Sequence, residues 1–528
     1  MRTIALAAAA LILAAAAAAG PFKPPADSRK VLDVKGVFQG YAIGMASNPL
    51  TILPPGLNER NPGESWSPAR ITHDFKPRAV SSVAEWEKVR ADIRKRIGDF
   101  LGKLPPRDLP LDAKVEGETD GGDYTVRVVS LAFDKERRAK IGMVFPKGAV
   151  TPAPAIILYG AYDNGIEKMA GEVYSRAYAI HLARLGFVTI VQEHWYEEFK
   201  TSGDSEVIPL AASVYMGLRT MDYLATVKEV DPKRVAVFGH VYGAEIAPFL
   251  AAMDDRVAAV ITSCSSDEVI SNNMAYWGGP SWMGGSRGLG CIQRYERYMF
   301  VGTRKYELGE SLGERGVAVP TLPFLSQEVR AMAAPRPFLS IMEDSTFTDS
   351  IRPAYDLYGD KAGEVTAIAH RWKTNLPVVA QEYMADFLLR NVCGIDAASP
   401  EAAKIAPTIL AGLKGEDPAG QLRAARLAVW WKCADKDVVA ELEKLVKFSK
   451  DVAVARTAAH ALGRAGAMKV LIQQIKHPDA GVRLAVVEAM QLHGGDDDFD
   501  VLRQNASDVD RWVREAKFQT NEINPKEQ

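Results

Sequence analysis

Residues 234–250, RVAVFGHVYGAEIAPFL, join two apolar runs through a short segment that contains two glycines four residues apart. The first run, VAVF, has the length and the β-branched content of a buried strand. The second run, AEIAPFL, carries apolar residues at helical spacing. Because glycine tolerates a sharp turn and a close approach of backbone, this stretch predicts a strand that passes through a tight turn directly into a helix.

The same alternation of strand and helix patterns extends to both sides of this stretch. The expected strands are YTVRVVSLAF, AKIGMVFPKG, APAIILYG, FVTIVQEHW, VAAVITSCS, RPFLSIME and EVTAIAH, and the expected helices include SRAYAIHLARLG and AASVYMGLRTMDYLATV. An earlier helix is predicted from apolar residues at helical spacing at Val83, Trp86, Val89, Ile93 and Ile97. Short apolar strands between amphipathic helices predict an α/β fold, with a doubly wound, mostly parallel sheet covered on both faces.

Beyond about residue 400 the strand patterns stop and the chain becomes Ala/Leu-rich helix. Four segments carry an aspartate a few residues before a helix that begins with an arginine. These arginines, Arg423, Arg456, Arg483 and Arg514, lie 33, 27 and 31 residues apart. The spacing is in the range of helical solenoid units and resembles short HEAT-type repeats over residues 400–522. An irregular helical bundle is the alternative.

The ends of the chain and its charge limit the possible partners and compartments. Lys and Arg total 64 against 66 Asp and Glu, a formal charge of −2 at pH 7, and without a basic run nucleic acid is not an expected partner. The segment MRTIALAAAALILAAAAAAG is typical of a secretory signal peptide over residues 1–19. We therefore expect an exported protein, periplasmic or extracellular, without a transmembrane anchor after cleavage. Residues 20–80, rich in Pro, Gly, Asn and Ser, are expected to be irregular.

The glycine turn itself has the form of a nucleophile elbow. In the motif G-x-S-x-G, the serine between the two glycines is exposed on a strained strand-to-helix turn and attacks the substrate. Here the five residues are Gly239-His240-Val241-Tyr242-Gly243. The spacing of the glycines is retained, but Val241 occupies the position of the nucleophile and has no atom that can attack a carbonyl carbon.

Residues 216–265, from MGLRTMDYL to VITSCS, resemble the central part of α/β-hydrolases related to dienelactone hydrolase, acetyl xylan esterase and glucuronoyl esterase. WEKVRADIRKRIGDFLGKLP (86–105) and MAAPRPFLSIMEDSTF (332–347) extend the resemblance. It implies an α/β-hydrolase domain over residues 81–395, with a lid insertion at about 266–318. It also implies a search for a serine, a histidine, a carboxylate and backbone N–H groups for an oxyanion.

The resemblance places the acid of such a triad at Asp344, after the strand FLSI. The alternatives are Asp349, and Asp267 or Glu268 after the preceding strand, and a solvated cap at a strand end is the competing role for each of them. The histidine of the family falls at Thr374, so it is expected to be lost, with His370 as the alternative. The residues considered for a displaced nucleophile are Tyr242, Ser263 and Ser265.

Other parts of the site are expected from backbone and from pocket-lining side chains. The N–H groups of Gly160, Ala161 and Tyr242 are the candidate oxyanion donors. Residues expected near the pocket are His194, His240, Trp277 and Trp282, the two tryptophans being able to stack on a sugar or aromatic ester or simply to fill the lid.

No metal or cofactor is expected. Glu193, His194 and Glu197 include ligand types for a divalent metal, but one histidine among acids is more often a group at the pocket edge. The glycine-rich segments lack a nucleotide-binding motif. The four cysteines lack C-x-x-C spacing, and Cys264 and Cys291 either form a disulfide or remain separate thiols.

These observations leave hypotheses from different classes. The first is an esterase-like domain with a degenerate triad, which binds a small ester, a carbohydrate or, through the helical repeats, a protein without efficient turnover. The second is an active carbohydrate or acetyl esterase that uses a displaced nucleophile. A third gives the hydrolase-like domain a purely structural role, because fold alone does not determine function.

Overall fold

A computed structural model of the chain provides the fold. It describes residues 80–102, 104–160, 165–167, 169–170, 178–193, 209–240, 242–263, 308–312, 318–320, 326–341, 345–368, 378–505, 507–508, 510 and 513–514. The expected signal peptide, the irregular segment before residue 80 and most of the expected lid lie outside these residues.

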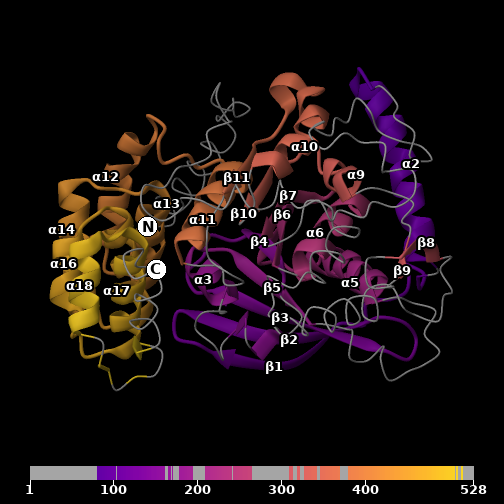
Figure 1. The fold of residues 1–528 in the computed structure, drawn as a ribbon. Coiled ribbons are helices and arrows are strands. Elements are labelled where there is room, and N and C mark those ends of the chain that lie inside the picture. The colour runs from indigo at the N-terminus through magenta and orange to yellow at the C-terminus, as the bar shows by residue number, and fades with distance from the viewer. Residues whose placement is uncertain are drawn as a thin grey trace.

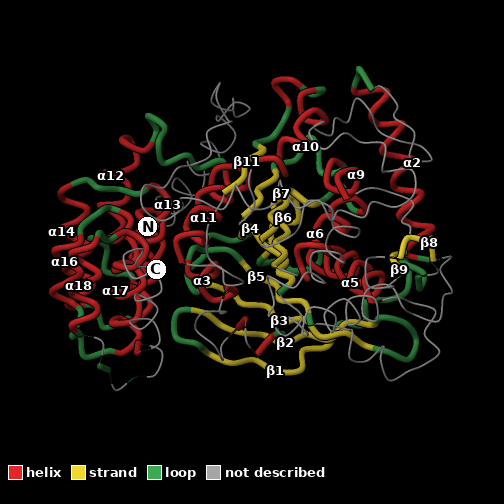
Figure 2. The backbone as a smooth tube through the Cα atoms, viewed as in Figure 1, coloured by secondary structure: helices red, strands yellow, loops and turns green. Residues whose placement is uncertain are grey.

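Within the described residues, nine strands form one sheet in the order β1-β2-β3-β5-β4-β6-β7-β10-β11 (Figures 1 and 2). Their bounds are β1 Lys114–Asp120, β2 Tyr124–Ala132, β3 Arg138–Pro146, β4 Ala153–Tyr159, β5 Val188–Gln192, β6 Val230–His240, β7 Val257–Ser263, β10 Phe338–Ile341 and β11 Val365–Ile368. The β1–β2, β2–β3 and β3–β5 pairs are antiparallel, and all pairs from β5 to β11 are parallel. This is the strand order of the α/β-hydrolase fold with one additional antiparallel edge strand, so the predicted fold class is confirmed.

Helices cover both faces of the sheet (Figure 1). One face carries α2 Val83–Leu101, α5 Pro209–Leu224, α6 Tyr242–Met253, α9 Ser326–Ala331 and α10 Ser345–Asp356, and the other carries α3 Tyr178–Arg184 and α11 Val378–Cys393. Because successive side chains of a strand point to opposite faces, Val235 and Val237 of β6 enter the first core and Ala236 and Phe238 enter the second. The run VAVF is apolar throughout for this reason. A short antiparallel pair, β8 Leu308–Leu312 and β9 Ala318–Pro320, lies at the end of the expected lid.

After α11 the described chain is helical. Its helices are α12 Ala402–Leu413, α13 Pro418–Trp431, α14 Lys436–Phe448, α15 Val452–Arg464, α16 Met468–Gln474, α17 Ala480–His493 and α18 Asp496–Gln504. Successive helices pack as pairs, and α13, α15 and α17 pack side by side in an inner layer while α12, α14, α16 and α18 form an outer layer. The aspartates noted in the sequence begin the inner helices, because the side chains of Asp417, Asp451 and Asp479 accept hydrogen bonds from backbone N–H groups of the first turn.

The inner layer packs directly onto the part of the chain that contains the nine-stranded sheet, residues 80–393, called the hydrolase part below. Gly148 and Gly186 have positive φ, and a Cβ atom on either would lie 2.5 Å from Leu422 or 2.7 Å from Arg426. The Arg426 guanidinium also donates to the Lys147 carbonyl at 2.9 Å. Side chains of the helical region therefore fit against the backbone of two hydrolase loops.

A buried network of charges completes this interface. The Arg184 guanidinium donates to both oxygens of Glu488 at 2.9 and 3.0 Å and to Asp123 at 3.0 Å. Arg456 donates to the second oxygen of Asp123 at 2.8 Å. Burial alone raises the pKa of a carboxyl group. At Asp123 the guanidinium groups of Arg184 and Arg456 outweigh burial, and at Glu488 Arg184 and the neighbouring histidines do so, so both pKa values are lowered.

We expect the chain to lose stability steeply in acid because of this network. A carboxyl group with a lowered folded-state pKa contributes stability that is fully present above its unfolded pKa, about 4, and lost as the pH falls through the folded value. Urea unfolding between pH 7 and pH 3 measures this dependence. Asp123→Asn should lower the stability at pH 7 but show a weaker pH dependence below pH 5. Equal slopes for the two proteins would contradict the assignment.

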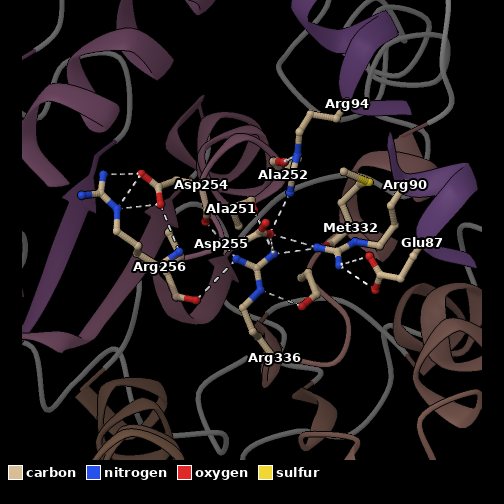
Figure 3. Close-up of polar contacts among 12 residues, drawn as sticks. Glu87, Arg90, Arg94, Ala251, Ala252, Asp254, Asp255, Arg256, Met332 and Arg336 are labelled. Carbon is tan, nitrogen blue, oxygen red and sulfur yellow. Dashed lines mark hydrogen bonds and ion pairs between the residues drawn. The ribbon is translucent and has the colours of Figure 1, made fainter. Parts of the chain in front are cut away.

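Arginines also fasten α2 and the segment before β10 to the end of α6. The guanidinium of Arg336 donates to five carbonyl groups, those of Ala251, Asp254, Val257, Met332 and Ala333, at 2.8 to 3.4 Å (Figure 3). Arg94 of α2 donates to the Ala252 carbonyl at 2.8 Å and to Asp255 at 2.7 Å. The last carbonyl groups of a helix lack hydrogen-bond donors within the helix. At the end of α6 the guanidinium groups of Arg336 and Arg94 are those donors. The helix that begins at the glycine turn is thus held at its far end.

Candidate functional site

The strand-to-helix turn at the end of β6 has the backbone geometry that its glycines predict. A Cβ atom on Gly239 would lie 1.9 Å from the carbonyl oxygen of Gly243, and one on Gly243 would lie 2.1 Å from the carbonyl oxygen of Tyr159. The Gly243 N–H donates to the Gly160 carbonyl at 3.2 Å. No residue with a side chain fits at either position without moving backbone, so both glycines show the close backbone approach that the motif predicts.

The apex residue, Val241, lies outside the described residues. Tyr242 is the first residue of α6, and its N–H belongs to the first turn, where N–H groups have no partner within the helix. An oxyanion donor must be an N–H group that is not already bonded within the helix, and the Tyr242 N–H meets this requirement by its place in the first turn. Its role as a donor remains a prediction. The sequence predicts that the Gly160 N–H donates to an oxyanion. In the structure the Gly160 carbonyl group accepts the hydrogen bond from Gly243, and the role of its N–H remains a prediction.

The other predicted site residues follow the carboxyl ends of neighbouring parallel strands. Because these ends meet at one edge of the sheet, the segments that leave them start close together. The residues concerned are Ala161 after β4, His194 after β5, Asp344 after β10, and His370 and Thr374 after β11. Their side chains, like those of Trp277 and Trp282, lie outside the described residues, and their roles remain predictions.

A serine and an imidazole meet next to the elbow. His240 pairs with Ser263 in the parallel register of β6 and β7, and its Nδ1 atom lies 3.1 Å from the Ser263 hydroxyl oxygen. His240 is 1% exposed and Ser263 is 0% exposed. The sequence singled out each residue separately, but the pairing depends on the register between two strands that are distant in sequence.

Aromatic side chains hold the His240 ring. The Tyr178 ring of α3 meets it edge-on at a centroid distance of 5.8 Å, and Phe238 lies almost parallel to it at 6.4 Å. His240 therefore faces the side of the sheet that α3 covers, beneath the turn.

Tyr159 at the end of β4 has a structural role. Its hydroxyl group donates to the Ser213 carbonyl of α5 at 3.2 Å, and burial raises its pKa. A phenol that is harder to ionise and already bonded is a poor nucleophile. Tyr159 instead ties the strand that touches Gly243 to the neighbouring helix.

The described residues provide no metal site. Glu193, after β5, accepts from the Ile166 N–H at 3.4 Å, so its carboxylate contacts the segment after β4. No group of three or more His, Cys, Asp or Glu side chains in the described part of the chain is placed to hold a metal ion. His194 and Glu197, the other members of the cluster considered from the sequence, are outside it.

Two further sequence expectations concern cysteines and membranes. Cys393 and Cys433 are buried free thiols, and burial raises the pKa of Cys393 to about 12. Cys264 and Cys291 lie outside the described residues.

Among the helices that the structure describes, none is long and apolar enough to cross a bilayer.

Comparisons with known proteins give the following similarities. A scan against protein-family models finds no match. The chain is similar to "Putative hydrolase YtaP" of Bacillus subtilis (strain 168), with 24% identity over 271 residues that cover 48% of this chain and 80% of that protein. A solved glucuronoyl esterase from Solibacter usitatus is 19% identical with a TM-score of 0.47, over 63% of this chain and 98% of that chain. A CE15 glucuronoyl esterase from Teredinibacter turnerae T7901 is 17% identical with a TM-score of 0.46, over 69% and 98% of the respective chains.

Proposed function

We propose that this chain is an exported α/β-hydrolase-fold protein whose triad has degenerated, and that it binds its ligand without efficient turnover. The observation that carries the proposal is the elbow. Gly239 and Gly243 keep the close backbone approach of a nucleophile turn, yet the sequence between them supplies Val241 and no hydroxyl group at the apex.

The chemical consequence is a loss of catalysis with retention of a binding edge. Removing the serine of such a triad costs on the order of 10⁶ in kcat, and the remaining rate comes from binding and the oxyanion donors. Backbone donors do not depend on side chains, and the strand ends that frame the site are in place. A small ester or a carbohydrate is the ligand class that the resemblance to esterases suggests.

The proposal includes the remaining parts of the chain. Residues 1–19 are a signal peptide that is removed, residues 81–395 form the hydrolase domain, and residues 400–522 form HEAT-like repeats. The paired helices in two layers support the repeat assignment, because each repeat of a solenoid contacts its neighbours in this way. A protein partner of the helical region would have to bind its outer layer, since the inner layer packs on the hydrolase part.

A second candidate function is an active esterase with a displaced nucleophile, and the contact between Ser263 and His240 favours it. An imidazole within hydrogen-bond reach of a hydroxyl is the minimum arrangement for activating serine. Against it, both side chains are buried, so a substrate carbonyl reaches Ser263 only if the neighbouring structure moves.

One set of variants separates the two functions. We expect the mature wild-type protein to be inactive on a panel of acetyl and aryl esters. The double variant Val241→Ser, Thr374→His should hydrolyse at least one ester about 100-fold faster than the background rate of the wild-type protein. Serine and histidine act as a unit, so neither substitution alone restores the triad. Initial rates at saturating ester, measured beside the single variants, test this.

The control is Val241→Ala with Thr374→His, which adds the same histidine without a hydroxyl group. Wild-type hydrolysis that disappears in Ser263→Ala would establish the second function and overturn the first. Wild-type hydrolysis that survives Ser263→Ala would overturn both assignments of the nucleophile.

A further inference from the structure

The helical region and the hydrolase part share one apolar core. The cluster on the α3 side of the sheet includes Phe238 of β6 and Leu388 of α11 together with Leu422, Val454 and Val486 of the inner helices. Figure 1 shows α11 between the sheet and the inner helices. The inner layer is therefore an internal surface, and the elements it covers are α3 and α11.

The contact with α3 is made by charges that are buried on both sides. Arg184, in the last turn of α3, binds both oxygens of Glu488 from α17, and Glu488 is 1% exposed. Two histidines also face Glu488, His181 of α3 at 3.4 Å and His460 of α15 at 3.2 Å. Truncating one partner of a buried ion pair is strongly destabilising, so this contact fixes the position of α3.

The same short helix reaches the candidate site at its other end. Tyr178, the first residue of α3, contacts both His240 and Phe238 of β6 with its ring. Helix α3 is only seven residues long, and its two ends are two turns apart. A displacement at Arg184 is thus transmitted to Tyr178 through one rigid element.

The contact with α11 has the same character. Arg464 of α15 forms ion pairs with Glu382 and Asp386 of α11, and Lys432 binds Asp386 at 2.7 Å. Helix α11 begins at Val378, directly after the segment that follows β11 and contains Thr374. The inner layer thus contacts the helix that follows the predicted histidine position in the chain.

We propose that the C-terminal helical region is an internal brace that positions α3 and α11 at the candidate site, with Arg184 and Glu488 as positioning residues for the His240 ring. This inference goes beyond the proposed function and does not depend on whether the site is catalytic. It assigns the inner layer to the chain's own hydrolase domain and not to a separate partner.

The test is Glu488→Gln in the full chain, with Glu443→Gln as the matched control. Glu443 pairs with Lys447 within α14 of the outer layer, away from the interface. Two readouts are measured by mass spectrometry: amide hydrogen exchange of residues 178–184, and exchange of the imidazole C2 proton of His240. We expect both to accelerate at least about tenfold in Glu488→Gln, because Arg184 loses one of its two buried carboxylates. The control should match the wild type at both.

Accelerated exchange in α17 alone, with α3 and His240 unchanged, would overturn the proposal, because a merely structural ion pair does not alter the imidazole. Should glutamine at position 488 unfold the chain, Arg184→Lys takes its place, since lysine keeps the charge but not the two-pronged contact. Tyr178→Leu completes the set: His240 exchange should rise while residues 480–493 keep wild-type protection, and an unchanged His240 would refute the link.

Discussion

Replacing Arg336 by methionine is expected to lower the free energy of unfolding by about 3 kcal/mol or more. Its guanidinium donates to five carbonyl groups, those of Ala251 and Asp254 at the end of α6, Val257 at the start of β7, and Met332 and Ala333 after α9. Each buried acceptor that is left without a donor costs about 1–3 kcal/mol. Methionine fills most of the volume but donates nothing. Urea unfolding followed by circular dichroism measures the change.

The matched control for Arg336 is Lys95→Met. Lys95 pairs with Asp99 on the exposed face of α2, and such surface changes stay within about 0.5 kcal/mol. If both substitutions cost the same, the carbonyl contacts of Arg336 contribute no more than an ordinary surface pair, and the description of α6 as held at its far end is wrong.

Gly243→Ala is the second change with a large expected effect, a loss of about 3 kcal/mol in the free energy of unfolding. Its Cβ atom would lie 2.1 Å from the Tyr159 carbonyl oxygen, so β4 and the start of α6 must move apart in the centre of the sheet. Overpacking of this kind typically costs about 1–3 kcal/mol, and a backbone obstacle places this position at the upper end. Thermal and urea unfolding of the variant report the loss.

Gly98→Ala provides the matched control, since Gly98 lies inside α2 and its Cβ atom would meet nothing within 4 Å. Alanine there should stabilise the chain by about 0.5–1 kcal/mol. Equal effects at the two glycines would show that the close approach at the elbow is relaxed in solution.

The fold could be predicted largely because each buried strand is a continuous apolar run that alternates with helices. The turn after β6 was predictable for a related reason, since glycine spacing is a local signal of close backbone approach. Strand β1 gave no such signal: Lys114–Asp120, KVEGETD, is exposed along its whole length. An edge strand without a buried face has no hydrophobic periodicity to detect.

The candidate site was predictable only in part because its contacts are non-local. The pairing of His240 with Ser263 follows from the β6–β7 register, and no local pattern encodes that register. The contacts of Glu488 with Arg184 join residues separated by about 300 positions in sequence, so the sequence indicated two domains but not their shared core. Asp344, His370 and Thr374 remain predictions from the resemblance.

The fit of Leu422 and Arg426 against Gly148 and Gly186 also bears on how this architecture can evolve. Gene fusions that join independent modules by a linker can be reversed or reshuffled, because neither module has adapted to the other. Here loop glycines of one part accommodate side chains of the other, and deletion of the helices would expose a large apolar surface to water. We therefore expect recombination between residues 393 and 402 to yield two pieces that each lack part of their core.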